Sequence, residues 1–464
     1  MKTRAARIRE TVVPRARTAA VMGETDVLVV GGGPAGIGAA VSAARQGMKV
    51  ILLEKRGFLG GNMTSAFVET CNHFLAGKKF KAHGLYAEIE KKYRKEYGRS
   101  DEIRDADSVP FRFSSEYLKI FLDEFMSEEK VDIKFHAFVS DVVAKRGLIT
   151  HAIIQTKCGP KAIKSRMVVD ASGDGDVAFH AGVPYEQGRP KDGKNMGGTT
   201  NFRVNGVDVG EVMKDKRTLH AISEAYRTAY KAGGLKMPCT REYPPMGRLT
   251  RGGVISYINY ADAYDVNPLD IDSLTGAEMR GRQGVKRMFN YLKSNFKALK
   301  DIELCSIATE MGFRDSRRIR GLYRLTCDDT EENRHFADSI AVFPRFYDYV
   351  SPDGNWSGDG RWDRTRKDPA WIFEWFDDRR TFEIPYRCLV PVGTRNMLVS
   401  GRCISADYIA ESSLRAVLAC MLTGQAAGTA AGICLRDKTA PADIDVKKLQ
   451  SSLARQGVVV RSPA

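Results

Sequence analysis

The chain has 464 residues, of which 43% are hydrophobic and 28% are charged, so it can bury a large core and we expect it to form two domains. No uncharged apolar run approaches the roughly 20 residues that cross a bilayer, and we therefore expect no membrane span. The formal net charge of +15 is spread along the chain, which favours anionic ligands and argues against a single nucleic-acid-binding tail.

The first segment, residues 1–23, is predicted to be a basic N-terminal arm. Six of its first seventeen residues are basic and only Glu10 is acidic. No apolar core or small-residue cleavage site follows, so a secretory signal is not expected. A transit peptide and a solvated arm both fit this composition, and we favour the arm.

The nine cysteines contain no CxxC pair. Their spacing argues against an iron–sulfur cluster and a structural zinc site, and we predict no metal site. Reduced thiols are typical of a cytoplasmic protein, which is the predicted localisation.

A nucleotide-binding turn is predicted directly after the first strand. Residues 26–30 form a short apolar run that ends in Gly-Gly-Gly-Pro-Ala-Gly, residues 37–46 have helical spacing, and residues 48–53 form a second apolar run. In this strand-turn-helix-strand unit, Gly31 permits the tight turn, Gly33 lets a pyrophosphate approach, and Gly36 lets the helix pack closely. Pro34 suits the first helical turn, where Ala35 follows it.

Glu54 ends the second strand and is predicted to accept both hydroxyls of an adenosine ribose. The residues after it resemble the extended fingerprint of FAD-binding proteins, in which a glycine pair lies beside the pyrophosphate and the flavin. Gly60 and Gly61 offer bare backbone to a bulky cofactor, although a flexible loop turn would also use them. The cofactor contacts implied by this resemblance are Lys55, Arg56, Gly60, Gly61, Asn62 and Met63.

The next segments are predicted to complete the cofactor domain. Residues 115–129 have the pattern of an amphipathic helix, and residues 131–136, 138–144 and 149–156 that of strands. A last strand at 167–170 runs into Ala171, Ser172 and Gly173, whose small side chains resemble the return to the sheet in FAD enzymes. Asp174 and Asp176 are interpreted as turn and cap residues, because no glutamate follows at calcium-loop spacing.

Residues 186–383 are predicted to form an inserted α+β substrate or cap domain, so that the cofactor domain, 24–185 and 384–440, is discontinuous. The four tryptophans, Trp356, Trp362, Trp371 and Trp375, cluster with Phe343, Phe346, Tyr347, Tyr349, Phe373 and Phe376. This cluster would suit an aromatic wall over a ring-bearing substrate, and it would equally suit a small cap core.

The C-terminal block carries the most specific pattern. It contains Phe-Glu-Ile-Pro-Tyr-Arg from residue 382, Ser-Gly-Arg-Cys-Ile-Ser from residue 400, Ser-Leu-Arg from residue 413 and an alanine- and glycine-rich run from residue 423. Together with the earlier motifs, it resembles the FAD-dependent oxidoreductase family, relatives of the fumarate reductase and succinate dehydrogenase flavoproteins, over residues from about 24 to 435. Residues 441–464 are then a C-terminal tail.

This resemblance implies a Rossmann-like, glutathione-reductase-like α/β FAD-binding fold. It also implies that the Gly-Arg after the last strand contacts the flavin and that the following helix points its N-terminus at the isoalloxazine. The contacts carried over in this way are Val139, Gly401, Arg402, Arg415, Ala416 and Gly424. A buried alanine-rich helix that serves packing alone is the alternative interpretation.

For catalysis, His73 is the leading candidate for proton transfer, because it follows the glycine-pair loop and histidine titrates near neutral pH. An ordinary hydrogen-bonded histidine remains the alternative. Arg314 and Arg318 are candidates for an anionic-substrate clamp or, as the resemblance implies, a proton donor. Because Arg317 lies between them, we expect a solvated basic face to account for at least two of the three.

The sequence therefore predicts an enzyme that transfers a hydride between a small organic substrate, ring-bearing or anionic, and the flavin of FAD. A tRNA-modifying flavoprotein and a flavin subunit of an electron-transfer complex are the alternatives, of which nucleic-acid binding is disfavoured. A hydroxylase or halogenase is also disfavoured, since the proline of the first pattern and the tryptophan motif of the second are absent. Homo-oligomerisation is left open.

Overall fold

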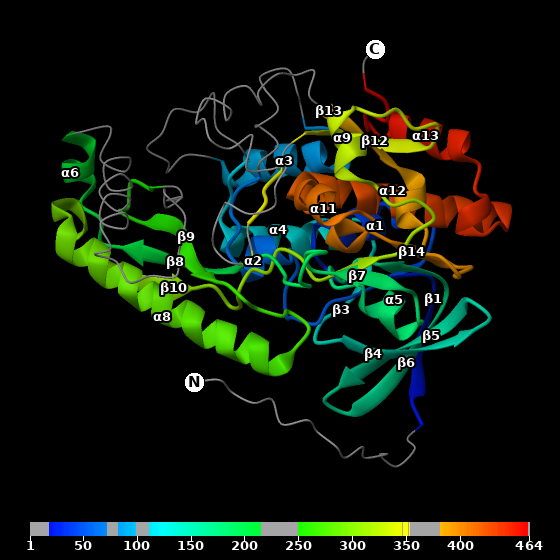
Figure 1. The fold of residues 1–464 in the computed structure, drawn as a ribbon, viewed down its shortest axis with the longest axis horizontal. Helices are drawn as coiled ribbons and strands as arrows, with labels where there is room; N and C mark the ends of the chain where they lie inside the picture. The colour runs from blue at the N-terminus through cyan, green and yellow to red at the C-terminus, as the bar shows by residue number, and fades with distance from the viewer. Residues whose placement is uncertain are drawn as a thin grey trace.

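A computed structural model of the chain describes residues 18–71, 82–98, 111–214, 249–345, 347–350, 352 and 381–462 (Figure 1). His73, the four tryptophans, Phe346, Phe373 and Phe376 lie outside these described residues. The predicted roles of these residues in catalysis and in an aromatic wall therefore stay predictions.

The centre of the fold is a sheet whose parallel strands are apolar runs buried on both faces, as covered parallel strands are. β1 (Ala20–Val30) pairs with β2 (Val50–Leu53) on one side and with β6 (Gly159–Asp170) on the other. β3 (Asp132–Lys134) extends β2, and β14 (Met397–Val399) pairs with the last residues of β6. The order at the carboxyl edge is therefore β3-β2-β1-β6-β14.

The first half of β6 pairs instead with an antiparallel hairpin, β4 (Phe138–Lys145) and β5 (Leu148–Thr156). Figure 1 shows this hairpin projecting from the lower part of the molecule, away from the helices above the sheet. The observed elements agree with the predicted strand and helix order. This part of the molecule is a Rossmann-like α/β fold.

Two helices, α1 (Pro34–Arg45) and α12 (Val417–Asp437), pack against each other beside the sheet. A Cβ built on Gly424 would lie 2.0 Å from the Ala35 carbonyl oxygen, and one on Gly428 would lie 2.0 Å from that of Ala39. Only residues without a side chain let these two helices approach so closely. The glycines of the C-terminal run thus set the distance between α1 and α12.

By length and composition α12 is the one helix of the described residues that could cross a bilayer, which the sequence did not lead us to expect. Its apolar window has a mean hydropathy of 1.5, but 94% of that window is buried inside the protein. The core helix of a folded protein meets the same criterion, so this finding is weak support for a membrane span.

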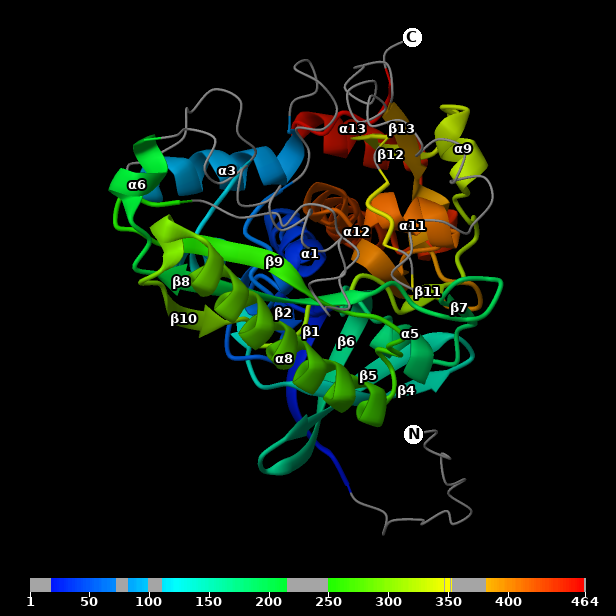
Figure 2. The same cartoon turned by 60° about the vertical axis from the view of Figure 1, so that its left-hand side comes forward.

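The cap is a second α+β unit, built around β8 (Gly198–Asn205), β9 (Ile255–Ala263) and β10 (Glu303–Ile307). The long helix α8 (Ile271–Asn295) covers this antiparallel sheet, and its buried residues face a separate apolar core. Figure 2 shows the long helix α8 lying along the cap strands β8, β9 and β10. The smaller cap elements are α6 (Val209–Lys214) and the 3₁₀ turn η3 (Lys297–Leu299).

The remaining elements surround the central sheet. The helices are α2 (Asn62–Ser65), α3 (Gly84–Tyr97), α4 (Ser115–Glu128), α5 (Asp176–His180), α9 (Cys327–Glu331), α11 (Tyr408–Leu414) and α13 (Val446–Arg455). The strands are β7 (Tyr185–Gln187), β11 (Arg317–Ile319), β12 (Ser339–Pro344) and β13 (Thr381–Pro385). The 3₁₀ turns are η4 (Tyr386–Leu389), η5 (Gly401–Cys403) and η6 (Pro441–Asp443).

The two largest apolar cores do not follow the predicted domain boundaries. Ile319, Ile340 and Phe343, from the segment assigned to the cap, belong to the same core as β1 and α1. Leu449 and Leu453 of α13, from the predicted tail, belong to it as well. The predicted domain boundaries remain predictions, and the packing adds these two segments to the larger core.

Candidate functional site

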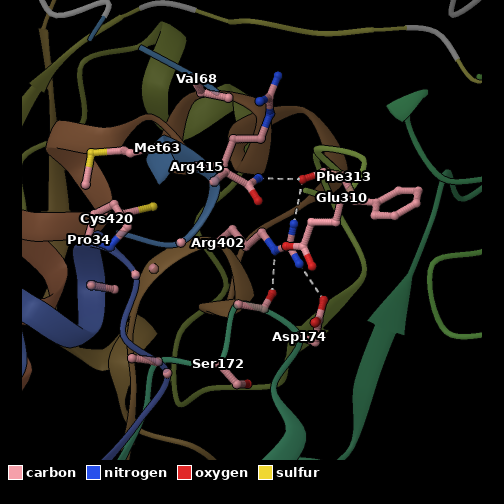
Figure 3. A pocket seen from close by; sticks show the side chains of 18 of the residues that line it. Pro34, Met63, Val68, Ser172, Asp174, Glu310, Phe313, Arg402, Arg415 and Cys420 are labelled. Atoms are coloured by element: carbon pink, nitrogen blue, oxygen red, sulfur yellow. Dashed lines mark hydrogen bonds and ion pairs between the residues drawn. The ribbon is translucent and has the colours of Figure 1, made fainter. Parts of the chain in front are cut away.

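A cavity of about 370 Å³ opens at the carboxyl edge of the central sheet (Figure 3). Its volume falls within the roughly 300–1,000 Å³ of small-molecule sites. One wall comes from the turns that follow β1, β2, β6 and β14, and the opposite wall comes from the cap. Ligands of open α/β sheets bind at this edge, because the loops after parallel strands meet there.

The turn after β1 has no room for a side chain at Gly31 or Gly36. Gly31 has φ +102°, and a Cβ on it would lie 2.4 Å from the Ala171 carbonyl oxygen, while one on Gly36 would lie 1.7 Å from the oxygen of Gly31. Gly33 is the N-cap residue of α1 and lines the cavity. A Cβ built on Gly33 would have the Cα of Gly61, at 3.7 Å, as its nearest neighbour, so its cavity side is open. The turn therefore exposes bare backbone and the amide end of α1 to a ligand, as a pyrophosphate requires.

Glu54 is held at the rim of this cavity by the chain itself. It is 2% exposed, and its Oε2 accepts from the amide of Gly32 at 2.7 Å while its Oε1 accepts from the amide of Arg56 at 2.9 Å. The Arg56 guanidinium pairs with Glu54 at 3.2 Å and with Glu310 of the cap. The carboxylate that was predicted to bind ribose is thus fixed in orientation beside the glycine turn.

Arg402 connects the turn after β14 to the turn after β6 and to the cap. Its Nε donates to the Gly173 carbonyl at 2.6 Å, its Nη1 to the Phe313 carbonyl at 2.6 Å, and its Nη2 pairs with Asp174 (Figure 3). Burial would raise the pKa of Asp174, but Arg402 and Lys55 outweigh it and hold that pKa below its usual value. Asp174 is therefore an ionised residue of the cavity wall, and its interpretation as a turn residue was too narrow.

Asp176, by contrast, lies in the first turn of α5, where its amide donates to the Ser172 hydroxyl at 3.0 Å. Burial and the neighbouring Asp174 raise the pKa of Asp176 to about 6. Its side chain pairs with Arg317 at 3.1 Å, away from the cavity lining. The predicted capping role is wrong, because Gly175 is the N-cap residue of α5 and no side chain caps this helix.

The cavity reaches the beginning of α12. Val417 and Cys420 of its first turn line it, together with Arg415 from the end of α11. Arg415 pairs with Asp348 at 2.9 Å, and its Nε has no hydrogen-bond partner in the part of the chain that the structure describes. The amide end of a helix of 21 residues carries partial positive charge, so this part of the cavity favours negative charge.

The cap wall was not predicted residue by residue. Leu274 and Glu278 come from α8, and Glu278 accepts from the amide of Met311 at 2.7 Å. The lining on this side is mostly apolar: Pro268, Leu274, Glu278, Glu310, Met311 and Phe313 come from the cap, and Val68 comes from the loop after α2. No motif marks these residues, and only the tertiary fold brings them to the site.

Most of the predicted cofactor contacts line the cavity. They are Gly31, Gly33, Pro34, Ala35, Glu54, Lys55, Arg56, Gly61, Asn62, Met63, Ala171, Ser172, Gly173, Gly401, Arg402 and Arg415. The exceptions are Gly36, Gly60, Val139, Ala416 and Gly424. Gly36 and Gly424 serve close packing, Gly60 meets the Thr64 side chain, and Val139 is buried in β4, while Ala416 caps α12.

Arg314 and Arg318 do not line the cavity. Arg314 bonds the Gly197 carbonyl and, at 2.9 Å, the Thr199 hydroxyl, whereas Arg318 donates to the Gly188 carbonyl at 2.9 Å. Arg317 packs its guanidinium over the Phe179 ring. The expectation that at least two of these arginines form a solvated face was wrong. Arg314 and Arg318 are buried, and Arg317 is only partly exposed.

The described members of the aromatic cluster are core residues. Phe343, Tyr347 and Tyr349 are all buried, and Phe343 packs edge-to-face on Phe382 with ring centroids 5.8 Å apart. None of the three lines the cavity. These residues are therefore packing residues, but they do not form one small cap core, because Phe343 belongs to the core of the central sheet and Tyr347 and Tyr349 belong to two other clusters.

Comparison with known proteins identifies a family model that matches most of the chain. The family model described as FAD dependent oxidoreductase matches residues 26–453. Among curated relatives, a flavin-dependent halogenase of Armillaria mellea is 42% identical over 66 residues, which are 13% of this chain and 13% of that protein. A leghemoglobin reductase of Glycine max is 58% identical over 38 residues, which are 8% of this chain and 7% of that protein.

These curated relatives are thus matched over a small part of their own length. Among solved structures, a geranylgeranyl bacteriochlorophyll reductase-like protein of Thermoplasma acidophilum aligns with 94% of this chain and 84% of its own. The identity is 12% and the TM-score is 0.45.

Proposed function

The chain belongs to the FAD-dependent oxidoreductase family and is therefore a flavoenzyme, and from this premise we propose that it transfers a hydride between a small organic substrate and the flavin. The observation that carries the proposal is the cavity itself, which lies between the cofactor turns and an apolar cap wall. We also propose the narrower kinship with the fumarate reductase and succinate dehydrogenase flavoproteins, on the motifs of the C-terminal block.

The residues of the cavity fit FAD. At Gly31 and Gly61 a Cβ would collide with neighbouring backbone, so these positions present bare backbone to the cavity that suits a pyrophosphate. Glu54 suits the ribose. Because β1 and β6 lie between β2 and β14, Glu54 and Gly401 are separated along the carboxyl edge by three strand spacings, roughly 14 Å. We therefore assign the adenosine to the β2 end and the flavin to the β14 end, beside Arg402 and the start of α12.

The chain's own residues would do the following. Arg402 and the amide end of α12 favour negative charge at the flavin end, and the bound FAD supplies hydride acceptance or donation there. Leu274, Met311 and Phe313 give the substrate side an apolar wall. Arg415 adds a cation that suits an anionic group, so we propose a small substrate with an apolar body and an acidic substituent.

The test is anaerobic reduction of the bound flavin. The purified protein, saturated with FAD, should be yellow and should lose its flavin absorbance when a substrate is added in the absence of oxygen. A panel of small carboxylic acids with apolar or ring-bearing bodies is the first screen. The same panel with the carboxylate replaced by an amide is the matched control, and it should reduce the flavin more slowly.

Hydride exchange with the organic substrate would be contradicted by a different pair of results. In that case only a pyridine nucleotide reduces the flavin, and the organic substrate is then hydroxylated or halogenated in the presence of oxygen. The short match to a halogenase makes this arm of the experiment necessary. Flavin reduced by none of the acids, in protein that holds FAD, would remove the proposed substrate class.

A further inference from the structure

A buried carboxyl group on α11 is not used by the proposed reaction. Glu411 is 1% exposed, and neither of its carboxyl oxygens has a hydrogen-bond partner within the residues that the structure describes. Buried side-chain oxygens normally have partners, and an orphaned pair is a costly arrangement for an ionised group. A carboxyl group in such a position needs a reason to be there.

Glu411 adjoins the flavin end of the cavity. Arg415 follows it by one helical turn, and residues four apart share a helix face, so both lie on the face of α11 toward the cavity that Arg415 lines. α11 also packs against η5, which carries Arg402. The titratable and charged groups around Glu411 are Asp315, Arg318, Arg402, Arg415, Tyr408 and Cys420.

The charged groups around Glu411 bond to other residues, although Nε and Nη1 of Arg318 and Nε of Arg415 have no hydrogen-bond partner among the described residues. Asp315 accepts from the Asn195 amide at 3.0 Å and from the Met196 backbone at 2.7 Å. Arg402 donates to Gly173 and Phe313 and pairs with Asp174, Arg415 pairs with Asp348, and Arg318 donates to the Gly188 carbonyl. Glu411 therefore has charged neighbours but no bonded one.

We propose that Glu411 is the group that takes up a proton when negative charge develops at the flavin end of the cavity. This role rests on the proposed placement of the flavin beside Arg402. Burial, together with Asp315, raises the pKa of Glu411 to about 8 against the opposing effect of the three arginines. Further negative charge in the adjoining cavity raises that pKa again, so the ionised carboxyl group takes up a proton.

The step balances in atoms and charge. An organic substrate gives two electrons and one hydrogen to the flavin as hydride, and its second hydrogen leaves as a proton. The ionised Glu411 carboxylate binds one proton and becomes a carboxylic acid, which offsets the negative charge of the reduced cofactor. Below the pKa of about 8, Glu411 already holds its proton in the oxidised protein, so the uptake is seen above that pH.

The test measures the reduction potential of the bound FAD against pH in the holoenzyme, with an enzymatic reductant and a reference dye in place of the organic substrate. Above the pKa of Glu411, the wild type should take up one more proton per two electrons than Glu411→Gln. The reduction equilibrium of the wild type should then change by a further factor of about ten per pH unit. Below that pKa the two proteins should have the same slope.

Glu411→Asp, which can still titrate, should restore the steeper slope above its own pKa. Glu383→Gln removes a buried carboxylate that is bonded to His335, Phe336 and Ser462 and does not line the cavity, so it should leave the slope of the wild type. Infrared difference spectra of wild-type reduction at alkaline pH should show a carboxylic acid band that appears with the electrons. That measurement needs no variant, so the proposal can be tested even if the Glu411→Gln protein folds poorly.

Equal slopes in the wild type and Glu411→Gln, or no acid band in the wild type, would overturn the role of Glu411. Neither result depends on an organic substrate, so the role of Glu411 can be tested even if the substrate search fails. Conversely, if proton uptake is confirmed but none of the carboxylic acids reduces the flavin, the role of Glu411 is supported and the proposed substrate class is contradicted.

Discussion

At the scale of single residues, Glu54 is the side chain on which we expect FAD binding to depend most directly. Glu54→Gln replaces one carboxylate oxygen by an amide nitrogen, which then faces a backbone N–H of Gly32 or Arg56. Hydrogen bonds to a charged group are worth about 1.5–3 kcal/mol, so the affinity for FAD should fall by about ten- to a hundredfold. Quenching of flavin fluorescence on titration measures this change.

Glu24→Gln is the matched control for this substitution. Glu24 lies on β1, the strand that precedes the glycine turn, but it is exposed and pairs with Lys164 at 3.0 Å. FAD affinity should be unchanged in that variant. Equal weakening by both substitutions would contradict a specific role of Glu54.

The buried position of Glu411 also predicts how the stability of the protein changes with pH. Its folded pKa of about 8 exceeds the unfolded value near 4.5, so the neutral acid is favoured by folding. This contribution is fully present below pH 4.5 and is lost as the pH rises through about 8. Glu411→Gln cannot ionise, so at pH 8 it should be more stable than the wild type by 1 kcal/mol or more, where one pKa unit corresponds to about 1.4 kcal/mol.

Urea unfolding of the apoprotein at acidic and alkaline pH measures this difference. The advantage of Glu411→Gln should shrink as the pH falls. An advantage that is the same at both pH values would show that the substitution changes packing and that ionisation of Glu411 contributes nothing. Glu383→Gln, which removes a fully bonded carboxylate, should destabilise the protein instead.

Glu54 was predictable because it follows a recognisable strand and glycine turn at fixed spacing. Glu411 was not, because its importance depends on burial and on Asp315, which is distant in sequence. The same reason explains Arg314 and Arg318: a run of arginines suggests a solvated face, and only the tertiary structure tells that backbone carbonyls bind them.

At the scale of elements, the contact between α1 and α12 determines the shape of the cofactor turn. A Cβ on Gly424 would lie 2.0 Å from the oxygen of Ala35, which itself lines the cavity. Gly424→Ala must push α12 away from α1, so it should destabilise the protein by about 1–3 kcal/mol, as overpacking of a core does, and should also weaken FAD binding. Chemical denaturation and FAD titration measure the two effects.

Gly276→Ala is the matched control, since it makes the same change in α8, where the new Cβ would meet only the end of the Arg280 side chain at 3.1 Å. An alanine in an exposed helix should stabilise the protein by up to about 1 kcal/mol. A Gly424→Ala protein of wild-type stability would contradict a packing role for this glycine.

The central sheet and α1 were predictable from periodicity, because buried parallel strands are continuous apolar runs between turns. The predicted boundaries differ from the observed ones mainly where strands extend beyond their apolar part, as β1 and β6 do. The pairing of β14 with the end of β6 follows from no local pattern, since these strands are more than two hundred residues apart. Long-range pairing is the part of a fold that a single sequence specifies least visibly.

At the scale of the whole molecule, the cap and the cofactor domain are joined across the cavity mouth. Arg56 follows β2, Glu310 belongs to the cap wall, and their side chains are 19% and 32% exposed. Partly exposed ion pairs contribute about 1 kcal/mol or less and are screened by salt. Glu310→Gln should therefore release FAD up to about fivefold faster than the wild type at low ionic strength.

The salt dependence distinguishes an ion pair from a packing contact. In the wild type, the rate of FAD release on dilution, followed by flavin fluorescence, should rise with ionic strength toward that of Glu310→Gln, because salt screens the attraction between Arg56 and Glu310. Glu303→Gln breaks an ion pair with Lys293 that lies within the cap, so it should leave the release rate unchanged. If Glu310→Gln is as slow as the wild type at every salt concentration, the Arg56–Glu310 pair does not hold the cap against the cofactor, and the apolar contacts of Met311 and Phe313 become the remaining candidates for that role.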